Sequence, residues 1–294
     1  MIKNKLTSHE SRTIINNLNR VNLKSADYKS LFYQIEKLIT KIPMRAFFIE
    51  KGTTFYRAVS YNNKPKEVCF LGSPPPEKVT GYQRCNIPGD PMFYGGCYIG
   101  AVLSEIDTKD GNNIYLSKWV TEKPFLCFRI PPDSPEEMKQ DAVFSRIETF
   151  FETIFSRPVH ETFSEQYKIT SAIAQKLTTG VIKNGNEDYE HQFGAVIYPS
   201  VVHPSRADNI AIKPSIEKSC LRLQDVSEIN IVENNENSFK IKTIDFSSEF
   251  IHDEIIWTGR TPNWTVKNGE VLIFTNEVNG WVARNRDGTV VHPH

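Results

Sequence analysis

Arg84, Tyr94 and Glu105 lie close together in the sequence, in the run GYQRCNIPGDPMFYGGCYIGAVLSE. A guanidinium offers a planar set of donors that matches a pyrophosphate, and an aromatic face attracts a flat cationic ring such as nicotinamide. A carboxylate stabilises the oxocarbenium character that develops when a bond to ribose breaks. The three residue types are therefore suited to a nucleotide that carries a pyrophosphate, a ribose and a cationic ring.

The segment between Arg84 and Tyr94 predicts that these two side chains approach each other. Residues 86–89 contain asparagine, proline and glycine, which favour a turn that returns Arg84 to the strand of Tyr94. Gly95 and Gly96 would let the backbone approach a ligand closely or adopt a positive φ. We expect Glu105 at the edge of the apolar stripe of a short helix, where it can reach a cleft from a rigid element.

Each of these three residues also has an ordinary structural interpretation. Arg84 could hold a loop, Tyr94 could be a core aromatic residue with a satisfied hydroxyl, and Glu105 could be a solvated helix position. Judged one at a time, the structural interpretation is favoured for each of them. The spacing alone leaves both interpretations open.

Ser200 is the fourth candidate, and it follows a predicted buried strand, FGAVIYP. Because Pro199 precedes it, a helix does not start there, and its hydroxyl is expected at a strand end beside a cleft. Ser200 is not in a G-x-S-x-G turn, which argues against a hydrolase nucleophile. His203 lies nearby but has no identifiable third partner, so a surface histidine is favoured.

The elements that must position these residues alternate irregularly between helix and strand. Apolar periodicity predicts two N-terminal helices, with Ser8 and Ser25 as expected caps, and an apolar face in the second from Tyr28 to Ile42. LGSPPPEKV is expected to be an extended loop. The lack of a regular βαβ rhythm predicts an α+β fold, with a compact mixed sheet and flanking helices. Helices are expected at 8–20, 25–42, 98–106, 135–155 and 162–178, strands at 53–60, 91–96, 113–120, 124–130 and 193–200, and a β-hairpin at 221–246 with its turn at 234–237.

Length and charge narrow the functional classes. The chain has 294 residues, with 35 Lys and Arg against 35 Asp and Glu. This balance argues against an electrostatic nucleic-acid or membrane binder, and no apolar run is long enough to span a bilayer. We expect a cytoplasmic protein with three parts, namely a helical N-terminal extension at 1–50, a core at 51–216 and a β-rich C-terminal extension at 217–294 that packs on the core.

The cysteines and histidines give no clear sign of metal or thiol chemistry. The five cysteines are widely spaced, so reduced structural thiols are favoured. A cysteine hydrolase that uses Cys85 or Cys97 with His191 is a weaker alternative, because no activating context is visible. The seven histidines lack the spacing of a zinc motif, and no metal is expected.

Four runs taken together resemble the RES-domain family, which is named for its arginine, glutamate and serine. The runs are FYRAVSYNNKP, GYQRCNIPGDPMFYGG, AVLSEI and GAVIYPSVVHPSRADNIAIKP, and they span about residues 53 to 216. Their order and spacing make the resemblance more specific than any single motif. The family's motif residues fall on Arg57, Arg84 with Asn86, Tyr94, Glu105 and Ser200.

The resemblance implies a fold similar to ADP-ribosyltransferases and an enzyme that consumes NAD as a substrate. Family members break the nicotinamide–ribose bond with water or inorganic phosphate as acceptor, and many are toxins of bacterial toxin–antitoxin pairs. By this resemblance Arg57 and Arg84, with Asn86 in the same turn, bind the NAD phosphates and ribose. Tyr94 lies on the nicotinamide side, Glu105 stabilises the oxocarbenium, and Ser200 donates hydrogen bonds in the pocket.

Two further functional classes stay open at this point. The same pocket could transfer ADP-ribose to a protein, or the chain could be a non-catalytic binding module whose cleft is occluded. The first two helices are also expected to expose apolar faces that would suit self-association or an antitoxin partner.

Overall fold

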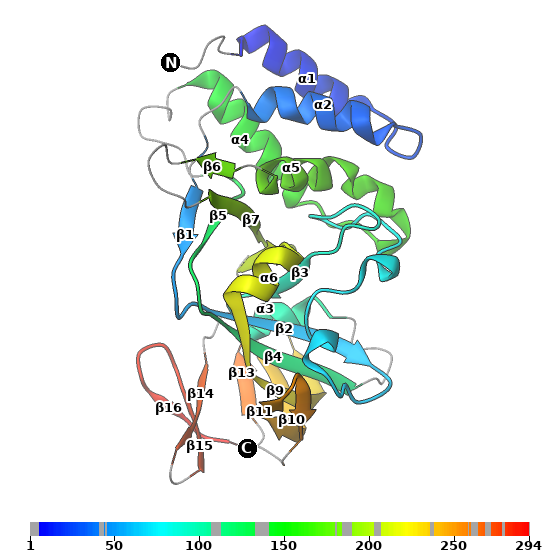
Figure 1. Ribbon diagram of the computed structural model, residues 1–294. Helices are drawn as coiled ribbons and strands as arrows, with labels where there is room; N and C mark the ends of the chain where they lie inside the picture. Colours follow the sequence, from blue (N-terminus) through cyan, green and yellow to red (C-terminus); the bar gives the residue numbers. More distant parts are fainter. Residues whose placement is uncertain are drawn as a thin grey trace.

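The computed structural model describes residues 6–293 apart from 41–43, 45, 107–112, 133–140, 180, 184–189, 203–206, 236–237, 258, 260–263, 268–271 and 278–279. Helices gather at one end of the molecule, and a large twisted sheet runs from beneath them toward the C-terminal end (Figure 1). The N-terminus lies at the helical end, and the C-terminus lies at the opposite end. This mixture of helices with a mainly antiparallel sheet confirms the α+β class.

An 11-stranded mixed sheet forms the framework, in the order β1-β5-β7-β8-β3-β2-β4-β9-β10-β13, with β6 paired to β7. β5 and β7 are parallel, and the other pairs are antiparallel. The strands expected at 53–60, 91–96, 113–120, 124–130 and 193–200 are all present, with shifted ends. The bounds are β1 Ala46–Ile49, β2 Thr54–Tyr61, β3 Phe93–Gly96, β4 Asn113–Thr121, β5 Phe125–Arg129, β6 Val181–Lys183, β7 Glu190–Pro199, β8 Asp208–Ile212, β9 Leu221–Asn235, β10 Ser238–Ser247 and β13 Trp264–Lys267.

The centre of the sheet is covered on both faces, because alternate residues of β7 belong to different cores. Val196 and Tyr198 pack into the cluster that includes the helices α1, α2, α4 and α5. Ala195 and Ile197 pack into a second cluster on the other face, where α6 (Pro214–Cys220) lies. Successive side chains on a strand point to opposite faces. The same alternation therefore decides which residues can face a cleft under the helices.

The helical layer follows the predicted pattern with corrected ends. α1 spans Ser8–Arg20, as expected, but Thr7 rather than Ser8 is its cap, because the Thr7 and Glu10 side chains form a reciprocal capping box. α2 spans Tyr28–Ile39 and is capped by Asp27 rather than by Ser25. α4 is Ala142–Phe155, α5 is Lys168–Thr178, and the expected helix at 162–178 begins instead with a 3-10 turn at Glu161–Tyr167.

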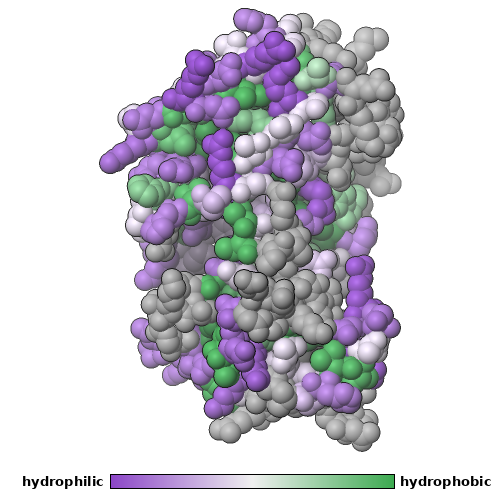
Figure 2. Space-filling view, turned by 180° about the vertical axis from the view of Figure 1, so that it is seen from behind, coloured by the Kyte–Doolittle hydropathy of each residue, from purple (hydrophilic) through white to green (hydrophobic). Residues whose placement is uncertain are grey.

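The apolar faces of α1 and α2 are buried inside the chain, which contradicts the expectation that they are exposed. Ile15, Leu18, Leu31, Ile35 and Leu38 all belong to the core that α4 and α5 share. The surface of this helical end carries many hydrophilic side chains on the face seen in Figure 2. Ile42 and residues 135–140, which were expected to be helical, lie outside the described residues.

The C-terminal part adds strands to the same sheet. β9 and β10 form the expected antiparallel hairpin, of which residues 236–237 lie outside the described part. A third core cluster joins β2, β4, β9, β10 and β13 to α3 (Ile99–Ser104). Two small sheets complete the chain, formed by β11 Glu249–Ile251 with β12 Glu254–Ile256, and by β14 Ile273–Glu277, β15 Gly280–Arg284 and β16 Val290–Val291. The division into three parts at residues 50 and 216 stays a prediction.

None of the helices in the described part of the chain is both long enough and apolar enough to span a bilayer.

Candidate functional site

A cavity of about 640 Å³ lies between the loops that follow β2 and the strands under the helical layer. Four of the residues proposed from the sequence line it, from four different elements: Arg57, Arg84, Tyr94 and Glu105. The described lining carries the positive charges of two arginines and a lysine and the negative charge of one carboxylate. Its net positive charge favours an anionic ligand. The other lining residues are Ala58, Pro74, Lys78, Val79, Thr80, Gly81, Tyr82, Gln83, Gly95, Val102, Ile106, Val159, Ser164, Tyr167, Tyr198 and Asn209.

Arg84 lies in a tight turn that the Tyr94 side chain stabilises. Gln83 and Asn86 form an isolated bridge across this turn. The Tyr94 hydroxyl donates to Asn86 Oδ1 at 2.6 Å and accepts from the Cys85 amide at 3.0 Å. The approach of Arg84 to Tyr94 was expected, but the contact joins the tyrosine to the backbone and to Asn86 rather than to the guanidinium. Asn86 is 2% exposed, so it supports the turn and does not line the cavity.

The Arg84 guanidinium is fixed by the end of α4. It donates from one nitrogen to the Phe155 carbonyl at 2.5 Å and from another to the Arg157 carbonyl at 3.3 Å. Carbonyls at a helix C-terminus lack partners within the helix and attract a cation. The guanidinium carbon also lies 5.2 Å from the centre of the Tyr167 ring. The loop-holding role considered for Arg84 is thus observed, while the side chain still faces the cavity.

Arg57 on β2 is held in a similar way. Its Nε donates to the Leu71 carbonyl at 3.1 Å, and another guanidinium nitrogen donates to the Tyr94 carbonyl at 2.6 Å. Burial lowers the pKa of Arg57, and the carboxylate of Glu217 opposes that shift. Glu217 is itself buried and accepts from the Ser73 amide. These contacts fix Arg57 beside the strand that carries Tyr94.

Glu105 is the residue that ends α3 rather than a member of its apolar stripe. Its Oε1 accepts from Ser200 Oγ at 2.6 Å and from Asn209 Nδ2 at 2.7 Å. Among the described residues its Oε2 has no hydrogen-bond partner, and the side chain is exposed toward the cavity. Two donors therefore orient one oxygen and leave the other available to a ligand.

Ser200 follows β7 as expected, but it is 1% exposed and lies behind Glu105 rather than in the cavity lining. Its contact with Glu105 makes it a positioning residue. Asn209 on β8 has the same role and was not found from the sequence. No local motif marks it, because it is brought to the site by the pairing of β8 with β3 and β7.

The glycines after Tyr94 serve strand packing, not the positive φ that the sequence suggested as one option. Neither Gly95 nor Gly96 is in the left-handed region. A Cβ on Gly95 would lie 2.8 Å from the Tyr56 carbonyl and 2.9 Å from the Phe93 ring. The missing side chain thus allows β3 to approach β2.

Tyr198 is a further cavity residue that the motif analysis missed. It lies on β7, two residues before Ser200, and its side chain packs on the helix-covered face of the sheet. Burial raises the pKa of Tyr94 and of Tyr198 well above the ordinary value. Both phenols therefore keep their protons at neutral pH and can donate hydrogen bonds.

The surroundings of the two cysteines argue against the cysteine-hydrolase alternative. Burial raises the pKa of the Cys85 thiol, and burial together with Asp208 raises that of Cys97 to about 11. A nucleophilic cysteine needs the opposite shift. The side chain of His191 lies outside the described residues. Within the described ranges, no group of three His, Cys, Asp or Glu side chains could hold a metal ion.

Searches of the sequence against protein-family models and against curated proteins give no match. The class established for this chain is therefore that of its fold, an α+β protein with a cationic, tyrosine-rich cavity.

Proposed function

We propose that this protein degrades NAD by cleaving the nicotinamide–ribose bond, with water or inorganic phosphate as acceptor, in a fold of the ADP-ribosyltransferase kind. One observation carries the proposal: Glu105 turns a free carboxylate oxygen toward the cavity while Ser200 and Asn209 hold the other oxygen. A carboxylate so oriented can stabilise positive charge at a ribose carbon. Arg57, Arg84 and Lys78 on the same walls suit a pyrophosphate.

The reaction balances without a cofactor. The C–N bond to the ribose breaks, and its electron pair neutralises the positive ring nitrogen, so nicotinamide leaves uncharged. An oxygen of the acceptor forms the new bond to the ribose carbon and loses a proton. The free oxygen of Glu105 can stabilise the oxocarbenium between these two events, and the cavity tyrosines supply stacking surface for the bases.

One observation favours a non-catalytic alternative. Both arginines already donate to backbone carbonyls, and the Tyr94 hydroxyl is used inside the turn. In a binding module these contacts would be the whole role of the three residues. Such a protein would bind or exclude a ligand without turning NAD over.

Nicotinamide release from NAD, measured with and without inorganic phosphate, separates these functions. We expect turnover by the wild type and a loss of about 100-fold or more in Glu105→Gln, because the variant removes the charge and keeps the shape. Glu77→Gln, which changes an exposed carboxylate on the neighbouring loop, is the matched control and should keep the wild-type rate.

The fate of the ribose names the acceptor. Free ADP-ribose indicates water, its phosphorylated form indicates phosphate, and a labelled polypeptide indicates transfer to a protein. Wild-type protein that releases no nicotinamide under any of these conditions would overturn the proposal. A toxin restrained by a protein partner is part of the same proposal, and NAD depletion with growth arrest on expression would support it. The partner would have to bind a surface other than the buried faces of α1 and α2.

A further inference from the structure

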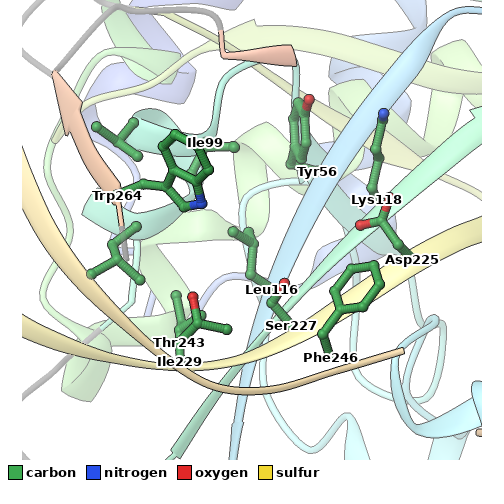
Figure 3. Close-up of a pocket in the computed structure, with 12 residues that line it drawn as sticks. Tyr56, Ile99, Leu116, Lys118, Asp225, Ser227, Ile229, Thr243, Phe246 and Trp264 are labelled. Carbon is green, nitrogen blue, oxygen red and sulfur yellow. The ribbon is translucent and has the colours of Figure 1, made fainter. Parts of the chain in front are cut away.

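A second, smaller cavity lies in the C-terminal half of the sheet, and none of its described lining residues lines the first cavity. β2, β4, β9, β10, β13 and the start of α3 form its walls (Figure 3). Its volume is about 50 Å³. A water molecule needs roughly 10–15 Å³ measured in this way, so the space holds about four waters or a group of a few heavy atoms.

Asp225 on β9 supplies the only acidic group among the described residues of this lining. Its carboxylate makes no hydrogen bond or ion pair with any described residue. Lys118 is its direct neighbour on β4, yet the two do not form an ion pair, and the ammonium end of Lys118 points away from the carboxylate in Figure 3. Asp225 is partly buried, and Lys118 opposes the effect of desolvation on its pKa only in part, so this carboxylate is costly without a hydrogen bond. It is the kind of group that a ligand would neutralise.

The walls around Asp225 are suited to an organic cation. The aromatic rings of Tyr56, Phe246 and Trp264 line the cavity together with Ile99 and Leu116. Phe246 lies next to Asp225 in the close-up, and Trp264 lies on the far side of the space (Figure 3). Aromatic faces attract ammonium groups, and apolar walls accept a short hydrocarbon body.

We propose that this cavity binds a small primary amine, with the ammonium group on Asp225 and the apolar body against Trp264, Phe246 and Tyr56. The site is independent of the proposed NAD cleavage, because the two cavities share none of the lining residues that the structure describes. Desolvation raises the pKa of Asp225 to about 6, so its carboxylate is mostly ionised at pH 7.5 and can pair with an ammonium ion.

The test is an NMR titration of the full chain with n-butylammonium chloride at pH 7.5, followed at the indole N–H of Trp264. n-Butanol and butyrate have similar bodies without the positive charge. We expect saturable binding of the amine by the wild type and at least tenfold weaker binding by Asp225→Asn. Ser227→Leu, which fills the cavity and keeps the charge, should weaken binding as much.

Glu249→Gln, at an exposed carboxylate on β11, is the control and should bind like the wild type. Amine binding should fall roughly tenfold from pH 7.5 to pH 5 as Asp225 takes up its proton. Among the lining residues that the structure describes, the other titratable groups are Lys118 and Tyr56, and those from β10 and β13 are uncharged. Absence of binding by the wild type, equal binding by Asp225→Asn, or equal binding of butanol would overturn the proposal.

Discussion

Tyr94→Phe tests whether the Tyr94 hydroxyl holds the turn that presents Arg84. The variant keeps the aromatic ring and removes the atom that joins Asn86 Oδ1 to the Cys85 amide. Both of these residues are buried, at 2% and 3% exposed, so water cannot easily replace the lost partner. Each hydrogen bond contributes about 1 kcal/mol net, and each buried group left unsatisfied costs about 1–3 kcal/mol.

We therefore expect Tyr94→Phe to lower the free energy of unfolding by about 2–4 kcal/mol, measured by urea denaturation. Tyr167→Phe is the matched control, because Tyr167 lines the same cavity and its hydroxyl has no hydrogen bond within the described residues. This control should stay within about 0.5 kcal/mol of the wild type. A loss below about 1 kcal/mol in Tyr94→Phe, or one equal to that of the control, would refute the assigned role.

Three more changes probe other parts of the structure. Lys168→Met removes the buried ammonium that donates to the Leu23 and Ala26 carbonyls. We expect the free energy of unfolding, measured in urea, to fall by about 2–4 kcal/mol. A fall of less than about 1 kcal/mol would contradict a stabilising role for these two hydrogen bonds. Gly95→Ala should lower the free energy of unfolding by about 1–3 kcal/mol, because the new Cβ meets the Tyr56 carbonyl. An unchanged midpoint of urea unfolding would show that β3 can move away from β2.

The third is Asp225→Asn. The folded pKa of Asp225, about 6, lies above its ordinary value of 3.8, so the folded state binds more protons between these values and stability falls as pH rises from 4 to 6. Asp225→Asn should remove up to about 3 kcal/mol of this change in the free energy of unfolding with pH. Identical stability–pH profiles for the variant and the wild type would contradict the raised pKa of Asp225.

Local pattern was enough to predict most elements and the proximity of Arg84 to Tyr94. The apolar periodicity of 8–20 describes a helix with one buried face, and the continuous apolar run at 193–199 describes a strand that is buried on both faces. The helix caps were misassigned because Ser8 and Ser25 are as suitable by type as Thr7 and Asp27, and only the hydrogen bonds distinguish them. Tyr198 could have been found by counting two residues back from Ser200.

Other site features depend on contacts that no local pattern encodes. The Arg84 guanidinium binds a carbonyl 71 residues away, and Asn209 reaches Glu105 across 104 residues. Asn209 reaches Glu105 because the sheet order places β8 next to β3. Arg84 reaches the Phe155 carbonyl because α4 ends beside the turn that carries Arg84. A single sequence gives the residue types for such contacts but not the pairing that creates them.

The anchoring of the two arginines is compatible with ligand binding because a guanidinium has five N–H donors. Arg57 and Arg84 each use two on backbone carbonyls, which leaves three on each for a ligand. Long side chains lose rotamer freedom when they bind, and here the protein has already restricted them. The contacts that could be taken for a purely structural role would therefore also preorganise a phosphate site, as Ser200 and Asn209 preorganise Glu105.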